Sequence, residues 1–243
     1  ESALAGGVFT PCAGSEPWTL GWEPPLGEAG APLVHAASGC LLVCARREEK
    51  VLPSAVVRER LAERAGEIET REGRPLGRQA RTRLREDIVH ELLPHAFARS
   101  TRVHAYVDPG HGWLVVDSPS PRRAEELIGL LRDGLGSVPV GPLAPRSDPS
   151  KVMTGWLLGR TDSAPFEAGD ECELRDPSSD GAVVRCRRQD LGADEVRGHL
   201  EAGKQVRRLA VSWGERLTCR IEEDLGLKQL RFPDVLLEEG AEA

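Results

Sequence analysis

The stretch from Leu52 to Arg99 constrains the fold of this chain more than any other part of the sequence. It begins with Pro53, which suits the first turn of a helix, and with Ser54, a residue type that caps helices. Apolar residues then recur every three or four positions, as on one face of a helix; they are Val57, Leu61, Ala65 and Ile68. The pattern predicts one amphipathic helix.

The second half of this stretch predicts a second helix. Leu84, Ile88 and Leu92 repeat at every fourth position until Pro94, which lacks the backbone donor that a helix needs. The segment between the two halves, Arg74-Pro75-Leu76-Gly77, is typical of a turn. Because two helices joined by such a turn form an antiparallel hairpin, we expect a helical hairpin that projects from the rest of the protein.

Positive charge gathers where the two predicted helices meet. The segment from residue 71 to residue 85 contains one acid, Glu72, and six arginines; these are Arg71, Arg74, Arg78, Arg81, Arg83 and Arg85. Along the helices themselves arginines alternate with glutamates, which is typical of a solvated surface. The end of the hairpin lacks this neutralisation, so it favours a polyanionic partner.

A second basic block lies between Val183 and Leu209. It sets seven cations against four acids, although the whole chain has a formal net charge of −7. The cations are Arg185, Arg187, Arg188, Arg197, Lys204, Arg207 and Arg208. Because the acids collect elsewhere, an acidic protein can still present a positive surface.

Length and composition define the broad class. A chain of 243 residues with 40% hydrophobic and 29% charged residues is long enough for one large domain or two smaller ones. No segment reaches the roughly 18 consecutive apolar residues of a membrane helix, and nothing near Glu1 resembles a signal peptide. We therefore expect a cytoplasmic protein whose six cysteines are mostly buried free thiols.

The remaining pattern predicts an α+β fold, because pairs of strands alternate with isolated helices. We expect a curved central body from residues 1–51 and 100–148, the helical hairpin from residues 52–99, and a second α+β domain from residues 149–243. Near the start, Trp18 and Trp22 are expected to close over a sheet.

Motifs for catalysis are weak. His90 and His95 resemble a zinc-protease pair, but their spacing is five rather than four, which separates them by about 140° around a helix. The sequence also lacks a nucleophile elbow, a P-loop and a dinucleotide-binding glycine motif. We expect no enzymatic activity, no cofactor and no metal.

Several phrases, taken together, are similar to one family, the bacterial recombination-associated proteins RdgC. They occur in the family's order along nearly the whole chain: Phe9-Thr10-Pro11-Cys12, Gly21-Trp22-Glu23-Pro24-Pro25, Cys44 to Pro53, Leu92 to Phe97, Leu135 to Val140, Arg187 to Leu191 and His199 to Lys204. Family members also carry an aromatic-rich strand and a helix before the first phrase and continue beyond the position of Phe232.

The resemblance implies a fold, a function and a set of functional residues. It implies an α+β chain that pairs with a second copy into a ring around double-stranded DNA, binds without sequence preference and restrains RecA in recombination and replication-fork repair at the nucleoid. The hairpin would be a finger, with Arg74 and Phe97 at contacts between copies. Together with the basic blocks, the candidate DNA-binding residues are Arg74, Arg78, Arg81, Arg187, Arg188, Gln189, Lys204 and Arg207.

The alternative is a protein-interaction module. In this hypothesis the helical finger binds a recombination partner, RecA being one candidate, and contact with DNA is incidental.

Overall fold

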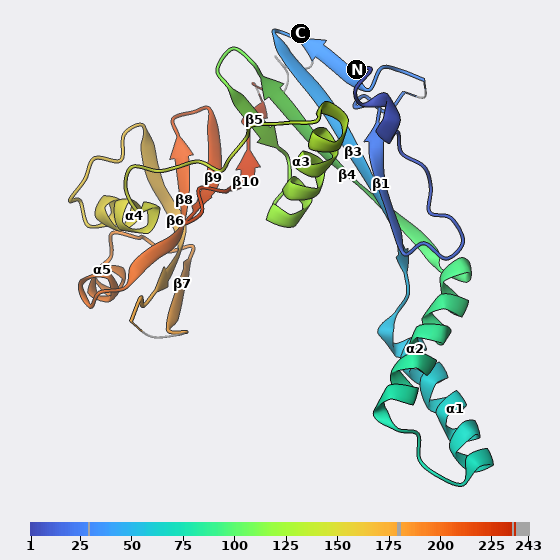
Figure 1. Cartoon of the computed structure of the whole chain (residues 1–243). Helices are drawn as coiled ribbons and strands as arrows, with labels where there is room; N and C mark the ends of the chain where they lie inside the picture. The colour runs from blue at the N-terminus through green and yellow to red at the C-terminus, as the bar shows by residue number, and fades with distance from the viewer. Residues whose placement is uncertain (29, 179–180, 235, 237–243) are drawn as a thin grey trace. The chain divides into compact units, whose positions relative to one another are not determined.

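The computed structural model describes residues 1–28, 30–178, 181–234 and 236, and the chain divides into two compact units, Glu1–Val140 and Gly141–Ala243. The class is α+β, as the sequence predicts: the described residues form two antiparallel sheets and five α-helices (Figure 1). The finer division of the first unit into a body and a separate hairpin domain stays a prediction.

The first unit is built on a pair of long strands that run antiparallel over eleven residue pairs, from Leu41 opposite Val107 to Val51 opposite Phe97. These strands, β3 and β4, form the centre of a sheet in which β1 and β2 both pair with β3, and β5 pairs with β4. The strands are β1 (Trp18–Glu23), β2 (Val34–Ala37), β3 (Cys40–Val51), β4 (Phe97–Asp108) and β5 (Trp113–Val116).

Two helices follow β3 and lead back into β4. They are α1 (Ser54–Glu72) and α2 (Arg78–Leu92), and a short 3-10 helix (Leu93–His95) containing Pro94 ends the second one. The expected cap is wrong: Pro53 occupies the N-cap position, and Ser54 is already helical, so its hydroxyl makes no capping hydrogen bond. Val57, Ala65 and Ile88 are the buried side chains of α1 and α2.

One face of this sheet packs against a helix, α3 (Pro121–Leu135). The core there contains Leu127 and Leu131 from the helix and Trp22, Val43 and Ala105 from the strands. Ser120 occupies the N-cap position of this helix, but its side chain makes no capping hydrogen bond. This core fixes the sheet from which the helical hairpin extends.

The expectation for the two N-terminal tryptophans is wrong. Trp18 and Trp22 do not cover a sheet but lie within β1, where Trp22 is 1% exposed and Trp18 is 48% exposed. Gly21 between them explains why a turn-rich segment forms a strand: a Cβ there would lie 2.5 Å from Cα of Phe9. The absent side chain lets the preceding segment approach, and the Phe9 amide donates to the Trp22 carbonyl over 2.9 Å.

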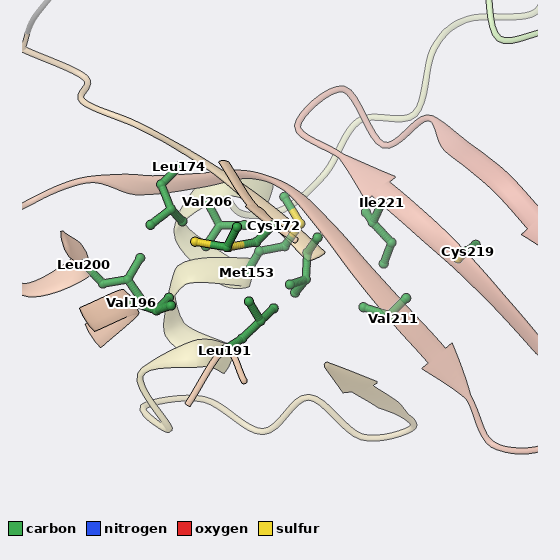
Figure 2. Packing of buried hydrophobic residues seen from close by; sticks show 12 residues of the cluster. Met153, Cys172, Leu174, Leu191, Val196, Leu200, Val206, Val211, Cys219 and Ile221 are labelled. Carbon is green, nitrogen blue, oxygen red and sulfur yellow. The ribbon is translucent and has the colours of Figure 1, made fainter. Parts of the chain in front are cut away.

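The second unit contains another five-stranded antiparallel sheet, in the order β10-β9-β8-β6-β7. Its strands are β6 (Phe166–Arg175), β7 (Val183–Arg187), β8 (Gln205–Trp213), β9 (Leu217–Glu222) and β10 (Leu227–Arg231), and its helices are α4 (Pro149–Leu157) and α5 (Asp194–Glu201). Figure 2 shows the core, in which Met153 of α4 and Val196 of α5 gather with Leu174 and Val206 of the sheet. Side chains that alternate with these therefore point away from the core.

The six cysteines are free thiols, and Cys44, Cys172, Cys186 and Cys219 are buried. Burial raises the pKa of the Cys44 thiol to about 11, which keeps it protonated near neutral pH. In the described part of the chain, no helix is both long and apolar enough to cross a membrane.

Candidate nucleic-acid interface

The turn between α1 and α2 carries the arginines expected at the end of the hairpin. Arg74 is exposed and its Nε lies 3.3 Å from a carboxylate oxygen of Glu72, so this charge is paired. Arg78 and Arg81 stand in the first turn of α2, and neither makes an ion pair with any described residue. The N-terminus of a helix is partly positive, so cations there do not stabilise it. Their charge is available to an anionic partner.

The limbs of the hairpin are close to electrically neutral. Arg64 of α1 lies 2.7 Å from Glu91 of α2, and Arg60 lies 3.3 Å from Glu63. Exposed pairs of this kind contribute about 0–1 kcal/mol each. The unpaired charge of the hairpin is therefore concentrated near its turn.

Phe97, the expected contact residue, is the first residue of β4 and is 88% exposed. Its partner across the strands, Val51, is 44% exposed. A phenylalanine this exposed contributes little to the core of its own chain. It gives the base of the hairpin an apolar surface.

A larger charged surface lies on the side of the second unit's sheet that faces away from the core. Cys172 and Leu174 point into the core, so Glu173 between them points outward. The register places Arg185 and Arg208 on either side of Glu173. We call this surface the arginine face; it consists of Glu171, Glu173, Arg185, Arg187, Arg208, Arg220, Glu222 and Lys228.

Glu173 is a buried acid at the centre of the arginine face, with 5% exposure. One carboxylate oxygen accepts from Nε of Arg185 over 2.9 Å and from Nη1 of Arg208 over 3.2 Å. Arg207 reaches the other oxygen at 3.9 Å. One buried carboxylate thus holds three guanidinium groups close together.

Glu222, also 5% exposed, plays the same part on the neighbouring strand. Its oxygens lie 2.6 Å from Nζ of Lys228, 3.0 Å from Arg220 and 3.4 Å from Arg208. Burial alone would raise the pKa of Glu222, but these cations together lower it below its usual value. The carboxylate is therefore charged at neutral pH and keeps the cations in place.

The structure brings some of the expected DNA-binding residues together. Arg187 belongs to the arginine face. Arg207 contacts Glu173, a buried acid of that face. Arg188 and Gln189 lie in the loop after β7. The backbone amide of Gln189 donates to the backbone carbonyl of Asp170 over 3.2 Å. Arg207 is held by Glu223, its Nε lying 2.6 Å from the carboxylate.

Lys204 lies immediately before β8 and makes no ion pair among the described residues. Arg74, Arg78 and Arg81 belong to the first unit, so they form a separate candidate surface.

Sequence reasoning missed Arg220, Lys228 and the two buried acids. Arg220 and Lys228 lie outside the basic block and reach it only through the pairing of β8, β9 and β10. The alternation of apolar and polar residues in Leu217–Glu222 indicated which side chains face outward. Cys219 and Ile221 point into the core, so Arg220 and Glu222 point away from it. Strand order, which the sequence did not reveal, was needed to use it.

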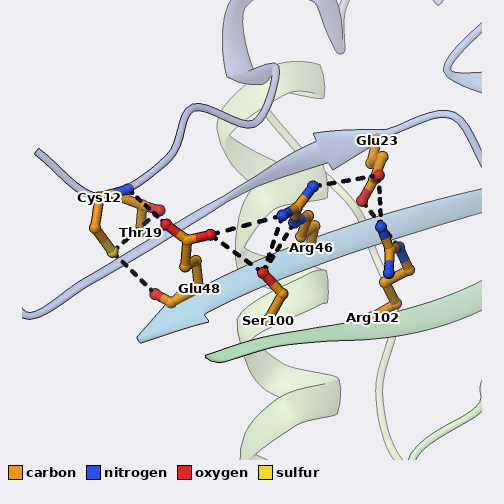
Figure 3. Close-up of polar contacts among 7 residues, drawn as sticks. All are labelled: Cys12, Thr19, Glu23, Arg46, Glu48, Ser100 and Arg102. Atoms are coloured by element: carbon orange, nitrogen blue, oxygen red, sulfur yellow. Dashed lines mark hydrogen bonds and ion pairs between the residues drawn. The ribbon is translucent and has the colours of Figure 1, made fainter. Parts of the chain in front are cut away.

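The sheet of the first unit carries a different polar network on the face away from α3 (Figure 3). Arg102 lies 2.9 Å and Arg46 3.5 Å from the same oxygen of Glu23. The hydrogen bond from Arg102 is the main cause that lowers the pKa of Glu23. These arginines have acidic partners within the strands.

Glu48 extends this network to the N-terminal segment. It accepts from the Cys12 amide over 2.9 Å and from the Ser100 hydroxyl over 3.2 Å, and it lies 3.6 Å from Arg46. The Cys12 amide is the largest cause that lowers the pKa of Glu48. Because its charges balance, the network anchors the segment and is a poorer candidate for a polyanion than the arginine face.

No group of three or more His, Cys, Asp or Glu side chains within the described residues is arranged to hold a metal ion. His90 and His95 fall in α2 and in the 3-10 helix that follows it.

The fold and these surfaces define an α+β protein. A helical hairpin is inserted between two strands of the first sheet, and the second sheet carries an arginine-rich face. The whole chain, residues 1–243, matches the family model described as "Putative exonuclease, RdgC". The chain belongs to the RdgC family.

Relatives in three bacteria carry the name recombination-associated protein RdgC. The Halorhodospira halophila protein is 43% identical over 242 residues, which cover 100% of this chain and 80% of the relative. The Aeromonas hydrophila protein is 41% identical over 239 residues, covering 98% and 79%. The Pseudomonas aeruginosa PAO1 protein is 42% identical over 240 residues, covering 98% and 78%.

Proposed function

We propose that this protein binds double-stranded DNA without sequence preference, and that two copies form a ring around the duplex. By occupying duplex DNA at the nucleoid, it modulates RecA-dependent recombination and replication-fork repair. The membership of a recombination-associated family supports a role at DNA. The proposed role needs no cofactor and no catalysis.

One observation carries the proposal: the arginine face sets five cations against three acids, and two of those acids, Glu173 and Glu222, are buried beneath the guanidinium groups. A surface of this kind presents positive charge outward while its negative charge lies below. Phosphates of any sequence carry the same charge, so such a surface discriminates little between sequences.

The proposal is tested by titrating duplex DNA of two unrelated sequences at a series of salt concentrations. Neutralised phosphates release counterions, so the logarithm of the affinity falls linearly with the logarithm of the salt concentration. We expect the same steep slope for both sequences. An affinity that does not change with salt, or that differs greatly between the sequences, contradicts the proposal.

The family model's description names an exonuclease, so catalysis is tested directly. Pure protein is incubated with end-labelled linear duplex in the presence of Mg²⁺ or Mn²⁺. We expect the DNA to stay intact. Shortening of the labelled strands that is lost when the metal is chelated would show nuclease activity instead.

The exposure of Phe97 and Val51 favours a second candidate, in which the base of the hairpin binds a protein partner and DNA contact is incidental. An RecA pull-down that survives nuclease treatment and high salt, and that the Phe97→Ser variant abolishes, supports this candidate. Loss of the interaction on nuclease treatment favours DNA binding.

A further inference from the structure

The arginine face contains a pocket of about 270 Å³. Four arginines from three strands line it: Arg185 and Arg187 of β7, Arg208 of β8 and Arg220 of β9. The acidic residues of its lining are Glu171 and Glu173. The pocket therefore joins residues that are far apart in the sequence, and its lining carries more positive than negative charge.

Arg187 and Arg220 have hydrogen-bond donors that no described residue engages. Arg187 makes no ion pair or side-chain hydrogen bond with any described residue. Arg220 donates from Nη2 to Glu222 over 3.0 Å, and its buried Nε has no hydrogen-bond partner in the described part of the chain. Arg220 therefore keeps hydrogen-bond donors that an oxygen entering the pocket can accept from.

The other two arginines are held in position from below. Arg185 and Arg208 both donate to one oxygen of Glu173, and Arg208 also lies 3.4 Å from Glu222. Side chains that are already fixed lose little conformational freedom when an anion binds. Each guanidinium keeps N–H groups that the two acids do not engage, and the planar guanidinium is well suited to binding phosphate oxygens.

We propose that this pocket is a binding site for a single phosphate group, supplied either by the backbone of DNA or by free phosphate. Arg187 and Arg220 contact the phosphate oxygens, and Glu173 and Glu222 are positioning residues that orient Arg185 and Arg208. The assignment to a DNA backbone phosphate rests on the proposed function; the phosphate site itself does not. At this site one phosphate is bound by directed hydrogen bonds, whereas the rest of the arginine face attracts phosphates only through its charge.

The test compares Arg220→Gln and Arg220→Lys with the matched control Arg216→Gln. Arg216 lies in the turn between β8 and β9 in the same unit, with its guanidinium 5.4 Å from the Trp213 ring centroid, and does not line the pocket. All three variants leave Glu222 paired with Lys228 and Arg208, so each is expected to fold, which circular dichroism checks.

The first arm measures duplex affinity at one salt concentration. Arg216→Gln removes one charge and is expected to weaken binding about twofold, whereas Arg220→Gln loses a phosphate contact and weakens it roughly tenfold or more. Arg220→Lys keeps the charge but not the fork, so it recovers only part of the loss. Full recovery by lysine, or equal losses in the two glutamine variants, would mean that only overall charge matters at this position.

The second arm measures thermal unfolding in inorganic phosphate against chloride at equal ionic strength. A ligand that binds the folded state raises its unfolding temperature, so phosphate is expected to stabilise the wild type and Arg216→Gln more than Arg220→Gln, which keeps only the general stabilising effect of this anion. If Arg220→Gln differs from Arg216→Gln in both arms, the site binds both DNA and free phosphate. A difference in duplex affinity alone assigns the site to DNA, and a difference in inorganic phosphate alone assigns it to free phosphate. No difference between the variants in either arm overturns the site.

The two proposals fail separately. Salt-dependent duplex binding that is equally sensitive to both glutamine substitutions, together with no difference between the variants in inorganic phosphate, keeps the proposed function and removes the phosphate site. A wild type that is stabilised by phosphate but does not bind duplex keeps the site and removes the proposed function.

Discussion

Arg188 adopts a backbone conformation that arginine normally avoids, with a φ of 53°. The left-handed conformation brings Cβ close to the following carbonyl oxygen and costs about 1–2 kcal/mol. The residue directly follows Arg187 of the arginine face and is itself one of the expected DNA-binding residues. The strain at Arg188 therefore lies directly beside the arginine face.

We therefore expect Arg188→Gly to increase the free energy of unfolding by about 0.5–1 kcal/mol, since relief of strain exceeds the entropic cost of glycine. The same change should weaken duplex binding, because a charge beside the phosphates is lost. Leu225→Gly is the control for DNA binding: its φ is 62°, so it also relieves strain, although the loss of its half-buried side chain offsets part of that gain, and it should bind DNA normally. Urea denaturation and a duplex titration measure the two effects. Unchanged DNA affinity in Arg188→Gly would remove this arginine from the interface.

Glu222 gives the arginine face a defined pH dependence. Its pKa is lower in the folded protein than the value of about 4.3 expected in the unfolded chain. A lowered carboxylate pKa contributes stability that is present above the unfolded value and is lost as the pH falls through the folded value. We expect Glu222→Gln to be less stable than the wild type at pH 7, and the difference to shrink as the pH falls below about 4.3. Urea denaturation over a pH series measures it; a difference that is constant with pH contradicts the role of the charge.

At the level of elements, hydrophobic periodicity and turn residues predicted both helices that lie between β3 and β4. Pro94 ends α2 as expected, because proline cannot donate the next hydrogen bond. The place of Trp18 and Trp22 within β1 was not predicted, because the role of Gly21 depends on its close contact with Phe9. Contacts between segments distant in sequence leave no local pattern.

Gly21→Ala tests this contact. The added Cβ would meet the backbone of Phe9, so the N-terminal segment or β1 must move, and we expect a loss of roughly 1–3 kcal/mol in the free energy of unfolding. Gly66→Ala is the control, because this position in α1 has no atom within 4 Å of the added Cβ. It should instead stabilise the protein by about 0.5–1 kcal/mol. Equal effects of the two substitutions in chemical denaturation would argue against a close approach at Gly21.

At the scale of the whole molecule, a chain with a net charge of −7 presents a cationic face because most of its acids lie elsewhere and two of the three acids on that face are buried. The sequence predicted the α+β class; that Arg187 contacts DNA stays a prediction. The sequence did not predict that Arg220 and Lys228 join the basic block, because their placement depends on the order and register of the strands. It also did not distinguish Glu173 and Glu222 from surface acids, since burial of a carboxylate depends on the cations around it.

The central claim, a ring of two copies around duplex DNA, is tested most directly by retention on circular and linear DNA of the same sequence and length. Protein is bound to each form attached to beads, and the beads are then washed at a salt concentration that weakens phosphate contacts. A closed ring cannot leave a circle but slides off free ends, so we expect retention on the circle and loss from the linear form, with blocked ends restoring it. Equal loss from both forms would mean that the protein lies on the surface of DNA and does not encircle it.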